Sequence, residues 1–151
     1  MQLQTPLKTG ITFSRSQVIA WENFVRYEPQ LDLKVNHYFS HGVYARELII
    51  PADTILTGEI HKFSNLNILI KGKIKVSIGD EIELIEAPFI VVSQAGVKRI
   101  AHTVTDCVWV TIHGTYEKDV DKIKEMFIAN SEKDWLEFSG SNQLELFNDL
   151  Q

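Results

Sequence analysis

The sequence contains a single cysteine, Cys107, so no disulfide bond can form within the chain. No uninterrupted apolar run approaches the roughly 18 residues that a membrane-spanning helix needs. The first ten residues, MQLQTPLKTG, lack the long apolar core of a secretory signal. From these absences we expect a cytoplasmic protein with no membrane partner.

Positive charge is also in short supply. Fifteen Lys and Arg residues stand against twenty Asp and Glu residues, which gives a net charge of −5 at pH 7 with neutral histidines. General electrostatic binding to nucleic acid or anionic lipid is therefore disfavoured, although a local basic pocket is not excluded. The 151 residues, 44% of them hydrophobic, suffice for one core, and we expect a single domain.

Residues 1–32 carry the signals of one helix. Ser14 lies three residues before Gln17, and this pair can satisfy the exposed amides at a helix start. Pro29 prevents further winding. Between these signals, three residues recur at helical spacing and predict an apolar stripe: Val18, Trp21 and Val25.

Residues 33–115 are typical of a sheet. Short β-branched and aromatic runs, separated by Gly, Pro, Asp and Asn, occupy residues 33–40, 43–50, 58–61, 66–71, 73–78, 81–85, 89–93, 97–103 and 107–113. No helix separates these runs, and parallel crossovers need a dozen or more residues each, so the sequence predicts an antiparallel sandwich or barrel. Gly79 indicates a tight hairpin, and Gly72 a bulge or a barrel corner.

Residues 116–151 predict a C-terminal helix followed by an apolar tail. Thr115 is the expected cap, with Glu117 and Asp119 in the first turn. The predicted buried stripe is Val120, Ile123 and Phe127. The acidic tail carries several large apolar residues around a Ser-Gly-Ser break, so we expect it to pack on the barrel or on a partner subunit, with a loose extension as the alternative.

The densest stretch, residues 42–76, reads GVYARELIIPADTILTGEIHKFSNLNILIKGKIKV. Its Pro-x-x-Thr turn, Gly-x-x-His, apolar strand and Lys-Gly-Lys-Ile resemble the first conserved block of the cupin superfamily. Residues 87–103, APFIVVSQAGVKRIAHT, are similar to the second block. The span 37–127 resembles small single-domain cupin-like proteins of bacteriophages. This resemblance implies an all-β, antiparallel cupin-type jelly-roll barrel, here with an N-terminal and a C-terminal helix.

The resemblance also implies four metal ligands, namely two histidines one residue apart, a glutamate and a third histidine. In this sequence His61 matches the first histidine. Side chains of other types fall at the remaining positions: Phe63, Asn67 and Arg99. A lone imidazole is a poor site for a divalent ion, so we expect no metal cofactor. The weak metal candidates are His61 together with two histidines outside the pattern, His102 and His113.

Positions 61, 63 and 67 share parity, so in an extended chain their side chains would point together into the barrel. An arginine and an asparagine there suit a carboxylate, a phosphate or a nucleobase edge. Buried Arg99 needs either an internal acid or a bound anion. Arg46 can serve the same pocket or pair with Glu59. For His113, which ends an apolar strand, we expect a hydrogen bond to the backbone.

Aromatic side chains complete the predicted site. Tyr44 shares parity with Arg46, and Trp109 can either stack on a planar ring or pack in the core. The candidate ligand-binding residues are therefore Tyr44, Arg46, His61, Asn67, Arg99, Trp109 and His113.

These features predict a metal-independent, cupin-like protein that binds a small anionic or nucleotide-like ligand without transforming it. The bacteriophage resemblance implies a use, which is sequestration of a nucleotide signal of host defence in the host cytoplasm. Two alternatives stay open: a metal-dependent cupin enzyme of oxygenase or isomerase type, and a structural or assembly module of a phage. Because such barrels expose strand edges, we expect a homodimer or a higher homo-oligomer.

Overall fold

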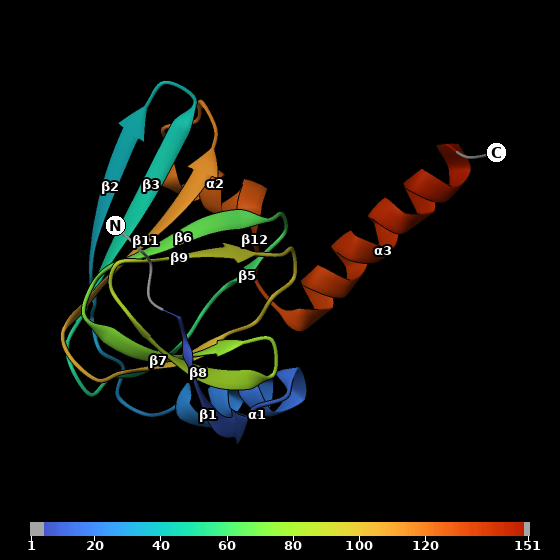
Figure 1. Cartoon of the computed structure of the whole chain (residues 1–151). Coiled ribbons are helices and arrows are strands. Elements are labelled where there is room, and N and C mark those ends of the chain that lie inside the picture. Colours follow the sequence, from blue (N-terminus) through green and yellow to red (C-terminus); the bar gives the residue numbers. More distant parts are fainter. Residues whose placement is uncertain (1–4, 150–151) are drawn as a thin grey trace.

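The computed structural model describes residues 5–149, and up to residue 140 also their side chains. Two five-stranded antiparallel sheets face each other and enclose a barrel (Figure 1). Sheet A has the order β1 (Leu7–Thr12), β8 (Glu81–Glu86), β7 (Lys73–Ile78), β10 (Ile100–Thr103), β4 (Ile55–Thr57). Sheet B has the order β2 (Lys34–Ser40), β3 (Val43–Ile50), β11 (Cys107–Gly114), β6 (Asn65–Lys71), β9 (Phe89–Ser93).

The chain crosses repeatedly between the two sheets. From β3 in sheet B it passes to β4 in sheet A, then to β6 in B, β7 and β8 in A, β9 in B, β10 in A and β11 in B. A third, two-stranded sheet pairs β5 (Ile60–His61) with β12 (Ile128–Ala129). Every pairing is antiparallel, which confirms the all-β reading of residues 33–115.

Two glycines act as predicted. Gly79 has φ +65° and allows the tight turn between β7 and β8, where Ile78 pairs with Glu81. Gly72 has φ +93° and separates β6 of sheet B from β7 of sheet A, so it lies at a barrel corner. A Cβ at Gly72 would lie 2.2 Å from the carbonyl oxygen of Asp106, and only glycine fits this approach.

Three short strands, β1, β4 and β12, were not predicted. Their sequences, LKTGIT, ILT and IA, are too short or too polar to show an alternating pattern. They form because neighbouring strands present open edges to them. Two predicted runs are also shorter than expected, since 58–61 pairs only over Ile60–His61 and 97–103 only over Ile100–Thr103.

Helix α1 (Arg15–Val25) begins as the sequence predicts. The Ser14 side chain accepts a hydrogen bond from the backbone N–H of Gln17, and the Gln17 side chain accepts one from the backbone N–H of Ser14. Val18 is 1% exposed and packs with Ile82 and Ile100. The helix therefore covers sheet A from outside the barrel.

Helix α2 (Val120–Phe127) begins later than predicted, because its N-cap is Asp119 and not Thr115. The Asp119 carboxylate accepts from the backbone N–H groups of two first-turn residues. The Thr115 hydroxyl instead accepts from the backbone N–H of Glu117, and the Glu117 carboxylate accepts from the next two N–H groups. These local hydrogen bonds hold residues 115–119 in a turn and delay the helix.

Helix α3 (Glu132–Asp149) runs continuously through Ser139 and Gly140, where the sequence suggested a break. At its start, Arg15 of α1 donates to the Glu132 carboxylate at 2.9 Å. The Trp135 ring covers Gly96, and Figure 1 shows the rest of the helix extending away from the barrel. The predicted apolar side chains Leu144, Leu146 and Phe147 lie outside the described side chains. None of the helices within residues 5–149 is long and apolar enough to cross a membrane.

The contact of Trp135 with Gly96 can be tested by substitution. A Cβ at Gly96 would lie 2.2 Å from the Trp135 ring, and the backbone has φ +81°. We expect Gly96→Ala to destabilise the protein by about 2–3 kcal/mol, measured by urea denaturation. Gly79→Ala is the control, because φ is +65° there but no atom lies within 4 Å, and it should lose only about 1 kcal/mol. Equal losses in the two variants would contradict the contact.

Candidate functional site

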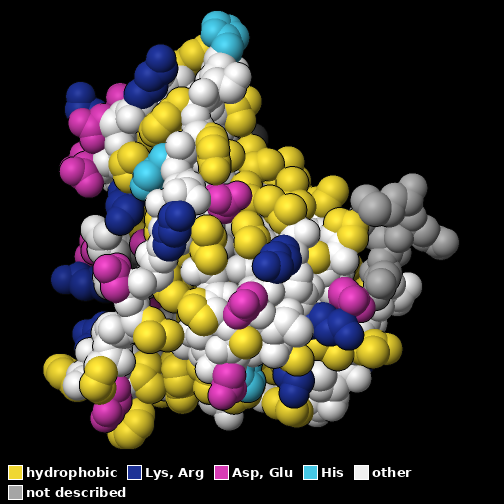
Figure 2. Space-filling model, turned by 90° about the vertical axis from the view of Figure 1, so that its left-hand side faces the viewer, with side chains coloured by type: hydrophobic (Ala, Val, Ile, Leu, Met, Phe, Trp, Pro, Cys, Tyr) yellow, Lys and Arg dark blue, Asp and Glu magenta, His cyan; other side chains and the backbone are white. Residues whose placement is uncertain are grey.

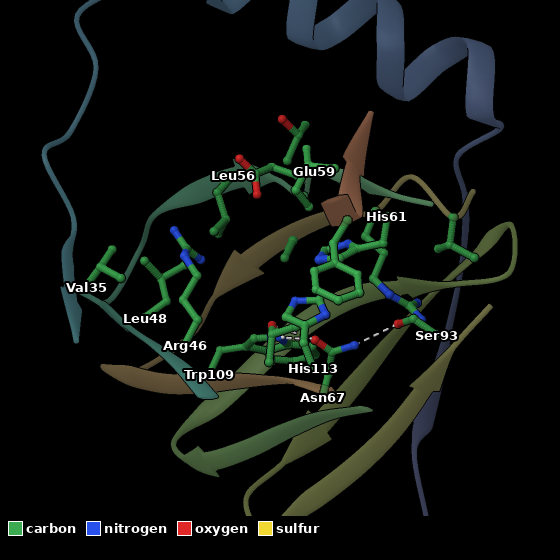
Figure 3. Close-up of a pocket in the computed structure, with 18 of the residues that line it drawn as sticks. Val35, Arg46, Leu48, Leu56, Glu59, His61, Asn67, Ser93, Trp109 and His113 are labelled. Carbon is green, nitrogen blue, oxygen red and sulfur yellow. Dashed lines mark hydrogen bonds between the residues drawn. The ribbon is translucent and has the colours of Figure 1, made fainter. Parts of the chain in front are cut away.

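The space between the two sheets is a cavity of about 450 Å³, a volume suited to a small molecule. Inward-facing residues of both sheets line it, and α2 borders it. Figure 3 shows that the cavity has two ends of different character. Val35, Leu48 and Leu56 form an apolar end, whereas the opposite end is polar.

Charged side chains give the cavity a positive character in an acidic protein. Three cationic residues line it, Arg46, Arg99 and Lys124, against one carboxylate, Glu59. The net charge of the whole chain is −5. This contrast between site and surface favours a small anion inside the barrel, without general attraction to polyanions.

Arg99 lies just before β10 and is held by neutral oxygens. One guanidinium nitrogen donates to the carbonyl of Ser77 at 2.5 Å and the other to the hydroxyl of Ser93 at 2.9 Å. Burial lowers the pKa of Arg99. Arginine nevertheless stays protonated in proteins at pH 7. Within residues 5–140, no acid forms an ion pair with Arg99. Of the two partners expected from the sequence, an internal acid or a bound anion, the internal acid is therefore absent from this part of the chain.

Arg46 projects from β3 into the cavity, where its side chain lies beside Leu48 and Leu56 (Figure 3). Its guanidinium has no hydrogen-bond or ion-pair partner among the described residues, and Glu59, which lines the same cavity, does not pair with it. Burial raises the pKa of Tyr44 and lowers the pKa values of His61 and His113, and the Arg46 charge acts on all three as a smaller, lowering effect. Arg46 is therefore a half-buried cation that lines the cavity with no partner among the described residues.

Asn67 is the centre of a hydrogen-bond network at the polar end. Its side-chain oxygen accepts from the indole N–H of Trp109 at 3.0 Å and from the Thr111 hydroxyl at 2.8 Å. Its amide nitrogen donates to Asn65 at 3.0 Å and to Ser93 at 2.8 Å. Four partners saturate the amide, so Asn67 positions its neighbours and keeps no group for a ligand.

Ser93 was not predicted, although it lines the cavity and is only 6% exposed. Its hydroxyl oxygen accepts from Arg99 and from Asn67, which uses both lone pairs. Its own hydrogen is thus left to donate, and no acceptor for it is present among the described residues. Ser93 reaches the cavity because β6 pairs with β9 in a register that places Ser93 opposite Asn65. A single sequence does not reveal that register.

Four ring systems stack along one wall of the cavity. His113 stacks on Tyr44 with ring centroids 6.0 Å apart, on His61 at 5.2 Å and on Phe127 at 4.7 Å. Neither ring nitrogen of His113 has a hydrogen-bond partner in the described chain, so the expected bond to the backbone is wrong. The backbone of Glu59 acts instead on His61, whose pKa it raises against the larger, lowering effect of burial.

Burial lowers the pKa values of His61 and His113 to about 4 each. Both imidazoles are therefore neutral at pH 7. They complete a planar, uncharged wall beside Arg46 and Arg99.

Phe63 departs from the predicted pattern. Strand β5 ends at His61 and the chain then bends, so parity no longer links position 63 to the interior. The Phe63 side chain is half exposed and packs edge-on against Phe127 and Phe138.

The donors in this barrel do not fit a divalent metal. No group of three or more His, Cys, Asp or Glu side chains able to hold an ion occurs within residues 5–140. Of the histidines suggested by the sequence, His61 and His113 lie face to face at 23°, so their nitrogens do not converge. His102 does not line the cavity, because it bonds to Asp53 at 2.7 Å on the surface. We therefore derive no chemistry through a metal ion.

The buried histidines predict a pH-dependent stability. In the unfolded chain both titrate near 6.5, and in the folded chain both have a pKa of about 4. Between pH 6.5 and 4 the unfolded chain therefore binds more protons, and the free energy of unfolding falls as the pH falls. We expect a loss of about 3 kcal/mol for the pair, because His61 is partly open to solvent.

Urea denaturation between pH 7 and pH 4 measures this loss. His113→Phe keeps a ring in the stack but removes one titrating group, so the loss in this variant should be roughly halved. An identical pH dependence in the two proteins would contradict the assigned histidine pKa values.

No protein-family model matches this sequence, and no curated protein matches it either. Among solved structures, KdgF from a Halomonas species matches with a TM-score of 0.51 at 8% identity, over 63% of this chain and 89% of that one. An RmlC-like cupin from Shewanella frigidimarina matches with a TM-score of 0.49 at 17% identity, over 58% and 80% of the two chains. An RmlC-like cupin family protein from Methanocaldococcus jannaschii gives 0.46 at 15%, over 60% and 89%.

At 8% identity, the KdgF match shows a common fold and transfers no residue role. The KdgF match, with its TM-score of 0.51, agrees with the alternation of successive strands between two antiparallel sheets. The fold class expected from the sequence is thereby confirmed. The chain is an all-β, antiparallel jelly-roll barrel of the cupin type with flanking N-terminal and C-terminal helices.

Proposed function

We propose that this protein binds a small organic anion inside its barrel, without a metal ion. The observation that carries the proposal is that Arg46 and Arg99 line one cavity and no described acid pairs with either of them. A guanidinium withdrawn from water loses hydration that neutral neighbours replace only in part. A bound carboxylate or phosphate supplies the missing countercharge.

Several hydrogen-bond donors that line the cavity have no partner in the described chain. The Ser93 hydroxyl has a hydrogen to donate. Arg99 uses two of its guanidinium nitrogens on protein oxygens, and Arg46 uses none. A surplus of donors beside two cations suits the oxygen atoms of an anionic group.

The rest of the cavity defines the remainder of the ligand. Val35, Leu48 and Leu56 offer an apolar end, and the neutral rings of Tyr44 and His113 offer a planar wall. A ligand that fits therefore combines one acidic group with an apolar or aromatic body. A nucleotide meets this description, and so does an aromatic or branched carboxylate.

Thermal unfolding in the presence of matched ligand pairs tests the proposal. Each pair joins an anion to its neutral analogue: benzoate and benzamide, hexanoate and hexanamide, a nucleoside monophosphate and its nucleoside. An anion present at 100 times its dissociation constant should stabilise the protein by about 2.7 kcal/mol, or roughly 5–10 °C in Tm. The neutral analogue should shift Tm by less than about 1 °C. Equal shifts within every pair, or no shift at millimolar ligand, would contradict the proposal.

The finer proposal is that the anion is a nucleotide signal and that the protein sequesters it, as the resemblance to bacteriophage cupin-like proteins implies. Two features of the cavity support this proposal, its cationic side chains and its stacked rings, which together suit a phosphate joined to a base. Sequestration requires that the ligand be returned unchanged. Chromatography of a bound nucleotide after release should recover the starting compound, and a converted product would favour an enzyme instead.

A further inference from the structure

The outer face of sheet B is apolar on almost every strand. Residues on this face alternate with those that line the barrel, and the outward set from β3, β6, β9 and β11 is Val43, Ala45, Glu47, Ile49, Leu66, Ile68, Ile70, Ile90, Val92, Val108, Val110 and Ile112. Tyr38 of β2 adds an aromatic ring. In Figure 2, hydrophobic side chains gather in the upper right part of the view.

This face is open to solvent in the described chain. Six of its apolar residues are 42–59% exposed, namely Tyr38, Val43, Leu66, Ile70, Ile90 and Val92. The helices pack elsewhere, since α1 lies against sheet A, and α2 and α3 contact β12. A patch of this extent is rare on a free monomer surface and marks an interaction site.

The sequence itself indicates that something covers both faces of these strands. An antiparallel strand with one solvated face alternates apolar and polar residues. Here the runs ILI in β6, FIVV in β9 and CVWV in β11 are apolar without interruption. Such runs are typical of strands that are buried on both sides.

We propose that this face of sheet B binds the same face of a second copy of the chain, forming a two-fold symmetric dimer. The charges on this face balance, because its one carboxylate, Glu47, is matched by Lys34, which lies opposite Ile49 in β2. Glu47 also accepts hydrogen bonds from Asn36 at 2.8 Å and Tyr38 at 3.3 Å on the same face. A sheet face of aliphatic side chains packs well against another sheet face about 10 Å away. Identical apolar surfaces are complementary to each other.

The area reaches the lower limit for a specific dimer. Five strands about 4.8 Å apart and about six residues long at roughly 3.3 Å per residue project an area of about 500 Å² per copy. Two copies therefore bury about 1,000 Å² when each face is treated as flat, and side chains that protrude from the face add to this area. Specific interfaces begin at about this size.

Size-exclusion chromatography with light scattering tests the dimer. Wild-type protein at 50 µM should elute with twice the chain mass of 17.3 kDa. Leu66→Lys and Ile90→Lys place a charge on half-exposed positions of the face, so both should give monomers. Ile55→Lys is the matched control, because Ile55 is 50% exposed but belongs to β4 of sheet A, and this variant should remain dimeric.

Two results would overturn the proposal. One is a monomeric wild-type protein at 50 µM. The other is a dimer that persists in both Leu66→Lys and Ile90→Lys, since such a dimer would use another surface. Circular dichroism of each variant shows whether it is folded, and a folded monomer in either lysine variant supports the proposed face.

Discussion

Replacing Arg46 by methionine should weaken binding of the anionic ligand by about 100-fold or more while leaving the protein as stable as the wild type. The guanidinium has no protein partner in the described chain, so its removal breaks no hydrogen bond within the barrel. A charge-assisted hydrogen bond to the ligand contributes about 1.5–3 kcal/mol, and two such donors lost together account for the expected factor. Isothermal titration with the best anion found by thermal unfolding measures the loss.

Arg99→Met is the matched comparison. It should also weaken binding, but it leaves the Ser77 carbonyl and the Ser93 hydroxyl without their donor, so it should destabilise the fold by about 1–3 kcal/mol. Arg46→Met has a second readout, because the Arg46 charge lowers the pKa values of His61 and His113. In the variant both pKa values should rise slightly above about 4, as measured by NMR titration, because burial is the larger cause of their lowering. Unchanged binding by Arg46→Met would remove Arg46 from the site.

Asn67→Ala should give the largest loss of stability, about 4 kcal/mol. The change removes one buried amide and leaves the Trp109 indole N–H and the Thr111 hydroxyl without their acceptor. Each buried polar group that loses its partner costs about 1–3 kcal/mol, and a connected network loses more than isolated pairs. Urea denaturation at pH 7 measures the free energy of unfolding.

Asn65→Ala is the control, because Asn65 lies on the same strand and is buried to a similar extent. Asn65 accepts one hydrogen bond, from Asn67, and its own nitrogen has no partner. This variant should therefore lose only about 1 kcal/mol. Losses of equal size would show that Asn67 is not the centre of the network.

The elements that the sequence could predict are those with a local signal. The Ser14–Gln17 capping box, the Gly79 hairpin and the Gly72 corner each depend on residues close together in the chain, and each is present in the structure. Strands β1, β4 and β12 form only because a neighbouring edge accepts them, so their own residues carry little signal. The start of α2 was misplaced because Thr115 and Asp119 are both favourable N-cap residues in isolation.

The candidate site shows the same division. Asn67 and Arg99 could be chosen from residue type and from their positions in the cupin resemblance, and Arg46 from its parity with Tyr44. Their partners could not, since the register of β6 against β9 decides that Ser93 meets Asn67 and Arg99. Phe63 was misplaced because one bend after β5 ends the alternation on which parity depends.

A crystal structure of the protein with its best-binding anion tests the central claim most directly. We predict that the ligand lies inside the barrel, with an acidic group within hydrogen-bond distance of the Arg46 or the Arg99 guanidinium group. A ligand bound outside the barrel, or a metal ion on His61 and His113 in its place, would contradict that claim.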